Sequence, residues 1–339
     1  MLVPGSIPKI ILSKSFKDLK LNIFKYYSKN TFFISLLVFV LAFAYIIYNI
    51  NNHKNLILEF TTNFSNEIIP FLILIFILQF LNWIFEAIKF QILLPNSADI
   101  KFLDIIKSVY VGNLTALITP KRLGNFIGRY WFLKSKTNEI TLSTVTGNIF
   151  QLLATVIMAF FSFFYLFFFK KENILSVNID PLLMFLIYGI ALLIIIYMLF
   201  TNNWETILKK NRLVEYFNLS SDYLDKISFS KRIRVLIYAL FRYWIFILQY
   251  YILLSAFGLS IDFTQVTAIV SVLFGIVTFL PSVGPGNLGT REAVSIFILG
   301  GSFLGIELSI VSFIVWIVNV VISALIGALI LLYSNKIVC

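Results

Sequence analysis

The chain has 339 residues, of which 60% are hydrophobic and 13% are charged, and its mean hydropathy is +0.93. This composition excludes an ordinary soluble domain and identifies an all-α, polytopic integral membrane protein. The single cysteine, Cys339, excludes an internal disulfide, and the single histidine, His53, stands in no cluster of metal ligands. We therefore expect no metal and no cofactor. The formal net charge of +11 is ordinary loop charge beside the apolar runs, so we expect no nucleic-acid partner.

Residues 1–31 are predicted to form a basic tail that is retained, because no small-residue cleavage site follows the first apolar run. Within this tail, residues 13–29 place lysines mostly away from a face of apolar side chains. That pattern is typical of an interfacial amphipathic helix on an anionic leaflet, and a disordered basic tail explains it equally well. The remainder, residues 32–339, is predicted to form a single membrane domain.

Six apolar runs are long enough to cross about 30 Å of hydrocarbon as helices, which takes roughly 20 residues. They lie near 32–50, 68–90, 142–169, 181–200, 235–258 and 305–333. Lysine and arginine concentrate in the tail and in the stretches 121–136 and 201–234, and they are scarce in the other loops. The positive-inside rule then places both termini in the cytoplasm of a multi-pass cell-membrane protein.

Two further apolar regions, 101–136 and 264–300, are interrupted in the middle by proline and glycine. With six full spans, the positive-inside rule is obeyed at every loop only if each of these two regions enters the membrane and returns to the side from which it came. We therefore predict two re-entrant segments, with full crossing as kinked helices as the alternative. Irregular backbone at membrane depth survives only where protein or a wet cavity satisfies its polar groups, so these breaks should lie at the working centre.

The two broken regions are similar to each other in sequence. Residues 108–129 and 271–291 share Ser-Val-x-x-Gly-x-x-Thr, then a proline, then Gly-Asn and, five positions after that glycine, an arginine. Because the charge pattern gives them opposite directions, they indicate an inverted repeat of about 68–169 and 235–333. In such folds the ligand site is expected near the bilayer midplane, where the interrupted segments meet.

The second copy contains G-x-G-x-x-G at residues 284–289, a spacing otherwise typical of a dinucleotide loop. No βαβ unit surrounds it, and Pro285 lacks a backbone donor, so the nucleotide interpretation fails. A helix starting near Gly289 favours an anion at its amino terminus, and Arg291 adds a guanidinium suited to phosphate. The alternative is structural: Arg291 pairs with an acid on another span, such as Glu86. Because adjacent residues on a helix point about 100° apart, we expect Arg291 or Glu292 to find a partner elsewhere.

Further polar residues lie inside the apolar runs and predict a polar groove between the repeats, or else ordinary hydrogen bonds between helices. On the second run they recur at three and four residue intervals and so share one helical face. The set comprises Gln79, Asn82, Glu86, Lys89, Asn148, Gln151, Gln249 and Asn319.

At its two broken segments the chain resembles the lysylphosphatidylglycerol synthase transmembrane domain family, also called the flippase-like domain family. The resemblance rests on the segments 117–129 and 280–292. It departs from the family pattern at Asn287 and Thr290. In bacterial relatives such a domain precedes a soluble aminoacyltransferase domain, which we do not expect to follow Cys339, so that activity is not carried over.

The resemblance implies a stand-alone lipid flippase that binds an anionic headgroup, either of a phospholipid or of a polyprenyl-phosphate-linked sugar. We expect membrane lipids, and a soluble or membrane partner enzyme, as its partners. The alternatives are a membrane glycosyltransferase or other lipid-modifying enzyme, for which we find no catalytic motif, and a scaffold subunit. The predicted substrate-binding residues are Glu86, Asn125, Arg129, Gly286, Asn287, Gly289, Arg291 and Glu292.

Overall fold

A computed structural model describes nine stretches of the chain. They are residues 29–52, 68–95, 99–119, 124–133, 137–169, 180–200, 227–280, 287–299 and 303–334. Across these nine stretches the elements are helices and no β-strand occurs, which confirms the predicted all-α fold. The prediction for the basic tail falls almost wholly outside them.

A long helical element lies at each of the six predicted spans. These elements are α2 (Lys29–Asn52), α4 (Ile69–Leu93), α7 (Thr137–Phe169), α8 (Pro181–Phe200), α12 (Phe229–Ala256) and the unbroken run of α15 (Phe303–Trp316), η5 (Ile317–Ile322) and α16 (Ser323–Tyr333). Among the described residues, four helices have the length and apolar composition to cross a membrane. They are Ile69–Leu93, Glu139–Phe169, Phe229–Ala256 and Leu304–Tyr333, while Val40–Asn49 and Leu182–Ile194 form shorter apolar helices.

Each broken region forms a pair of helices. The first pair is α5 (Phe102–Ile118) and α6 (Asn125–Leu133), and the second pair is α13 (Phe263–Phe279) and α14 (Thr290–Ile298). The second helix of each pair has 9 residues, which rise only about 13 Å and so cannot cross about 30 Å of hydrocarbon. This geometry agrees with re-entrant hairpins, which we name the first hairpin (α5 and α6) and the second hairpin (α13 and α14).

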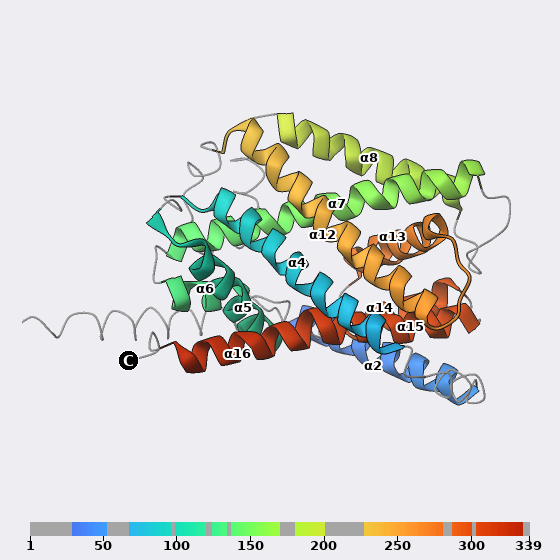
Figure 1. The fold of residues 1–339 in the computed structure, drawn as a ribbon. Coiled ribbons are helices and arrows are strands. Elements are labelled where there is room, and N and C mark those ends of the chain that lie inside the picture. The colour runs from blue at the N-terminus through green and yellow to red at the C-terminus, as the bar shows by residue number, and fades with distance from the viewer. Residues whose placement is uncertain are drawn as a thin grey trace, which may run out of the picture.

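The arrangement has the character of an inverted repeat. In Figure 1 the first hairpin lies at the left and the second hairpin at the right of a central pair formed by α4 and α12. These central helices are antiparallel, because Gln249 of α12 bonds Ile75 of α4 while Arg242 bonds Glu86. The hairpins are also exchanged between repeats: α5 packs against α16, and α13 packs against α7.

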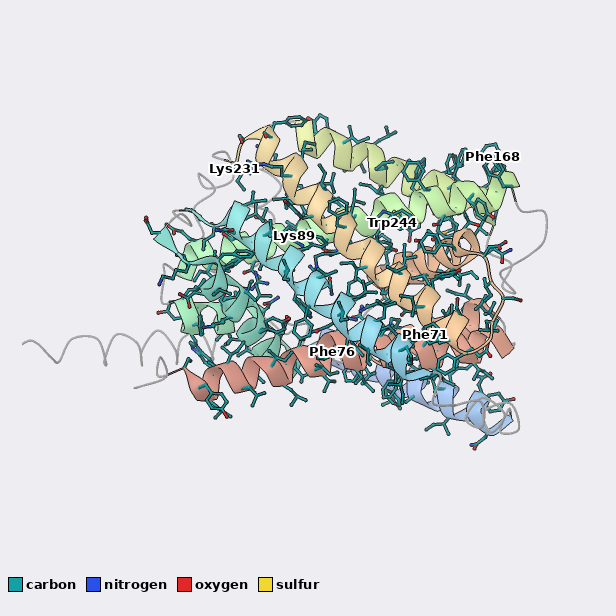
Figure 2. All side chains as sticks on the ribbon, viewed as in Figure 1. Phe71, Phe76, Lys89, Phe168, Lys231 and Trp244 are labelled. Carbon is teal, nitrogen blue, oxygen red and sulfur yellow. The ribbon has the colours of Figure 1, made fainter. Side chains whose placement is uncertain are left out.

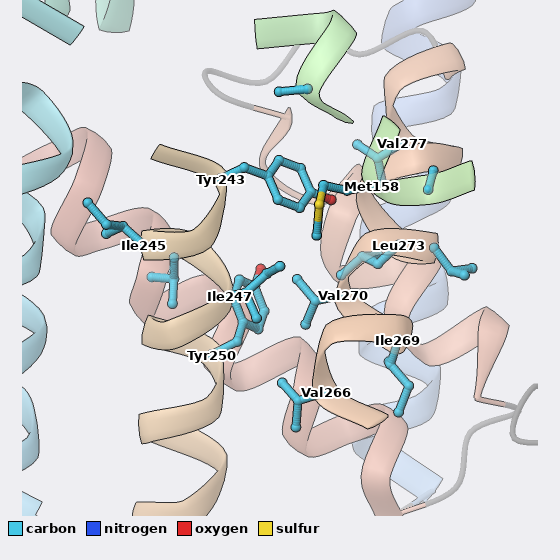
Figure 3. Packing of buried hydrophobic residues seen from close by; sticks show 14 of the residues in the cluster. Met158, Tyr243, Ile245, Ile247, Tyr250, Val266, Ile269, Val270, Leu273 and Val277 are labelled. Atoms are coloured by element: carbon cyan, nitrogen blue, oxygen red, sulfur yellow. The ribbon is translucent and has the colours of Figure 1, made fainter. Parts of the chain in front are cut away.

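Each hairpin packs against a hydrophobic core: a large cluster surrounds the second hairpin, and a smaller one lies around the first. Figure 3 shows Tyr243, Ile247 and Tyr250 of α12 facing Val270 and Leu273 of α13, all of them buried. On the outside, Phe71, Phe76, Phe168 and Trp244 are exposed, as expected of side chains in contact with lipid, whereas Lys89 lies inside (Figure 2).

Candidate functional site

Three cations surround one carboxylate in the interior of the protein. Glu86 Oε1 accepts from Arg129 Nη2 at 2.8 Å, and Glu86 Oε2 accepts from Lys89 Nζ at 2.9 Å and from Arg242 Nη1. None of these four side chains is more than 9% exposed. Within the described stretches, three positive charges against one negative charge leave an excess of two in a place where uncompensated charge is expensive. We call these four residues the cation cluster.

The cation cluster is assembled from three elements that are distant in sequence, and a fourth supports it. Glu86 and Lys89 are three residues apart on α4 and therefore share a face. Arg129 is on α6 and Arg242 is on α12. Gln151 of α7 completes the arrangement, because its Oε1 accepts from Lys89 Nζ at 3.3 Å and from Arg242 Nη1 at 3.2 Å.

Close packing of the first hairpin sets the position of Arg129. A Cβ atom added to Gly124, just before α6, or to Gly128 of α6 would overlap the backbone of α5, at Thr115 and Val111 respectively. Glycine at these positions therefore lets the two helices lie almost in backbone contact. Asn125 accepts from Arg129 Nε at 3.1 Å and holds the guanidinium toward Glu86. The ring of Phe90 lies 4.4 Å from the same guanidinium and covers it.

Arg242 is the main residue of this site that the sequence analysis missed. Its Nε donates to Asn82 at 2.9 Å, and its guanidinium lies 5.2 Å from the ring of Trp83. A signal was available, because an arginine inside the apolar run 235–258 is costly unless it is paired. That arginine has no counterpart in either hairpin motif, and so a comparison of the two copies could not find it.

A chain of side-chain amides connects the cation cluster to the last helical run. Asn82 donates to Asn319 Oδ1 at 3.0 Å, and Asn319 donates to Gln249 Oε1 at 2.8 Å. Asn319 belongs to η5, a stretch of π-helix inside an otherwise α-helical run. Such π-bulges are frequent at functional sites. These bonds correspond to the alternative of ordinary hydrogen bonds between helices. Two predicted members stand outside the network: Asn148 is exposed on α7, and the side-chain amide of Gln79, although buried, forms no hydrogen bond to the network within the described residues.

The second hairpin carries a neutral pair instead of a cluster of cations. Arg291 Nη2 donates to Glu292 Oε1 at 2.9 Å and to the Ser312 carbonyl at 2.7 Å. Arg291 thus has a partner elsewhere, the Ser312 carbonyl of α15, as expected, but its ionic partner is the adjacent Glu292. Both side chains are long enough to fold back on each other despite diverging from the helix. The alternative pairing of Arg291 with Glu86 is also absent, since Glu86 is taken by the three cations of the cluster.

The start of α14 is closed by the protein itself. Gly289 has a φ of 80°, and its N–H donates to Glu292 Oε2 at 2.7 Å. The carboxylate of Glu292 thus accepts one of the backbone N–H groups that we predicted for an external anion. Asn287 precedes it with a φ of 61°, in the left-handed region that asparagine tolerates.

The predicted site residues therefore fall into two groups. Glu86, Asn125 and Arg129 meet at the cation cluster, whereas Asn287, Gly289, Arg291 and Glu292 gather at the start of α14. Gly286 lies outside the described residues. The described part of the chain holds no group of three or more His, Cys, Asp or Glu residues that could bind a metal ion.

The chain matches the family model described as lysylphosphatidylglycerol synthase TM region over residues 32–327, and it belongs to that family. This assignment confirms the resemblance carried by the two broken segments, and it supports a role connected with membrane lipids. No curated protein and no solved structure matches the chain.

Proposed function

We propose that this protein is a flippase-like lipid transporter that binds an anionic lipid headgroup at the cation cluster. The observation that carries this proposal is the charge balance: Lys89, Arg129 and Arg242 share the single carboxylate of Glu86 while buried. A headgroup phosphate would supply the missing negative charge and would accept charge-assisted hydrogen bonds from both guanidinium groups.

The cation cluster is built by residues of both repeats, and the acyl or prenyl chains of a bound lipid would stay in the bilayer. The residues that build it lie on α4, α6 and α12, which belong to both repeats. Rocking of one repeat against the other would therefore open the cluster to one leaflet and then to the other. We propose a phospholipid or a polyprenyl-phosphate-linked sugar as substrate, in the cell membrane and with both termini in the cytoplasm. A partner enzyme that makes or uses this lipid fits the same scheme.

The start of α14 is the weaker candidate for the headgroup. Arg291 and Glu292 neutralise each other, and the Glu292 carboxylate already accepts the Gly289 N–H. We assign to this neutral pair the role of holding the second hairpin against α15, through the bond from Arg291 to the Ser312 carbonyl.

The first test is mass spectrometry of the lipids that copurify with the protein, measured against the host membrane. Wild type should enrich one anionic lipid class, and Arg242→Gln should lose the enrichment. Arg234→Gln is the matched control, because Arg234 is exposed on the same helix. Lipid of bulk composition in the wild-type sample would overturn headgroup binding. The enriched lipid then enters a leaflet-exchange assay in proteoliposomes, where wild type should accelerate exchange and Arg242→Gln should not.

A further inference from the structure

The charge count of the cation cluster carries information about which headgroup it takes. Two of its four charges cancel, since Glu86 neutralises one of the three cations. A ligand that brings one negative charge leaves one buried cation unbalanced, whereas a ligand that brings two leaves none. Burying an unbalanced charge costs several kcal/mol even after relaxation, so the number of charges on the ligand is expected to matter.

The arrangement of donors points the same way. Arg129 donates to one oxygen of Glu86, while Lys89 and Arg242 crowd onto the other oxygen. Lys89 and Arg242 also share Gln151 Oε1 as a second acceptor. Lys89 and Arg242 therefore share both of the oxygens that Lys89 contacts. A terminal phosphate has three strong acceptor oxygens, one for each cationic group, whereas a phosphodiester has two unesterified ones.

We propose that the cation cluster selects a headgroup with about two negative charges, a phosphomonoester or a diphosphate, over a phosphodiester with one. This inference rests on the proposed function, because it concerns the lipid bound at the same cluster. The cluster would accept phosphatidic acid, polyprenyl phosphate and polyprenyl-diphosphate-linked molecules. It would disfavour phosphatidylglycerol and other phosphodiesters.

The second hairpin provides an internal comparison for this argument. Its arginine, Arg291, is balanced by one carboxylate and one carbonyl, and no excess charge remains there. If the buried arginines served only to fasten the fold, a one-to-one pairing of this kind would suffice at both hairpins. A one-to-one pairing of Arg129 with Glu86 leaves the additional cations Lys89 and Arg242 unexplained, and a doubly charged ligand explains them.

The test is a binding measurement in phosphatidylcholine nanodiscs that contain labelled phosphatidic acid or labelled phosphatidylglycerol. At about pH 7.5 the phosphomonoester carries close to two charges, and we expect wild type to prefer phosphatidic acid by about tenfold. Arg242→Gln removes one cation and should bring that preference close to one. Arg234→Gln, the exposed control on the same helix, should retain it.

Lowering the pH provides a second and independent readout. The second pKa of a phosphomonoester is about 6, so phosphatidic acid has about one charge at pH 5 and the preference should disappear there. The protein groups that face the ligand are Glu86, Lys89, Arg129 and Arg242. Any change in their own charge is reported by the binding of phosphatidylglycerol, whose phosphodiester does not titrate in this range.

The outcomes separate this inference from the proposed function. Equal binding of both anionic lipids at about pH 7.5, with both lost in Arg242→Gln, would overturn the charge selection and leave the headgroup site standing. Binding of neither lipid would overturn the proposed function itself. Inorganic phosphate is included as a competitor. If phosphate at equal concentration displaced phosphatidic acid, the cluster would select a free doubly charged ion. That result would keep the charge selection and would overturn the lipid as the ligand.

Discussion

At the residue scale, Glu86 pairs with three cations, and an anionic ligand would compete with its carboxylate for the same three cations. Substituting it by glutamine leaves Lys89, Arg129 and Arg242 facing one another without a negative charge. We expect Glu86→Gln to lower the free energy of unfolding by about 3–5 kcal/mol, as breaking a buried ion pair does. The measurement is thermal unfolding of the purified protein in a neutral detergent.

The same variant should respond more strongly than wild type to an anionic lipid. A ligand that binds the folded state raises stability by mass action, and here it would also supply the missing charge. Short-chain phosphatidic acid should therefore restore part of the stability that Glu86→Gln loses. Glu307→Gln is the matched control: Glu307 is a buried carboxylate that forms no ion pair within the described residues. Identical lipid responses in both variants would contradict a ligand at the cation cluster.

At the scale of elements, the contact between α5 and α6 decides where Arg129 points. Gly128→Ala places a methyl group against the Val111 carbonyl and the Thr115 hydroxyl, so the two helices must separate. We expect a loss of about 1–3 kcal/mol in unfolding free energy, and a loss of lipid binding because Arg129 moves away from Glu86. Thermal unfolding and lipid binding measure the two effects.

Gly147→Ala is the control for this substitution. An added Cβ atom there would lie 3.6 Å from Leu93 and 3.7 Å from Lys89, at ordinary contact distances. In the middle of α7 the change should be neutral or stabilise the protein by up to about 1 kcal/mol. If Gly128→Ala were tolerated as well as Gly147→Ala, close packing of the first hairpin would not be what positions Arg129.

The sequence predicted the elements better than their contacts. Long apolar runs specify membrane helices, and proline with glycine marks the breaks, since both signals are local. The pairing of Arg129 with Glu86 joins α6 to α4 across the fold, whereas from the sequence Glu86 was considered as a partner of Arg291. The return of Glu292 to its neighbour Arg291 depends on side-chain rotamers, which no spacing reveals. Arg242 was not predicted as a site residue because the apolar run 235–258 was interpreted by its average hydropathy, in which one charged residue has little weight.

At the scale of the whole molecule, the two repeats are similar in architecture and different in charge. Each hairpin packs against the last helix of the opposite repeat, and α4 and α12 cross at the centre. Yet among the described residues Arg129 of the first hairpin joins a cluster with excess positive charge, while Arg291 of the second hairpin is paired with Glu292. Two similar repeats with a single cluster of excess charge fit a transporter in which the fold supplies the motion and that cluster supplies the binding.

The inverted arrangement makes a prediction about the two sides of the membrane. Asp99 lies three residues before the first hairpin and Asp262 immediately before the second, and both are exposed. The antiparallel α4 and α12 lead to opposite ends of the molecule in Figure 1. In a background in which Cys339 is replaced by serine, we expect a membrane-impermeant maleimide to label Asp262→Cys in intact cells and to leave Asp99→Cys unlabelled, because the basic loops favour the cytoplasm.

A membrane-permeant maleimide should label both single-cysteine variants, which controls for expression and for the reactivity of each thiol. Labelling of Asp99→Cys alone from outside would keep the inverted repeat and reverse its orientation. Labelling of both from the same side would contradict the inverted repeat, because two hairpins that enter from one side are related by an axis along the membrane normal. The cation cluster would then face one leaflet only, and alternating access by rocking of the repeats would no longer follow from the fold.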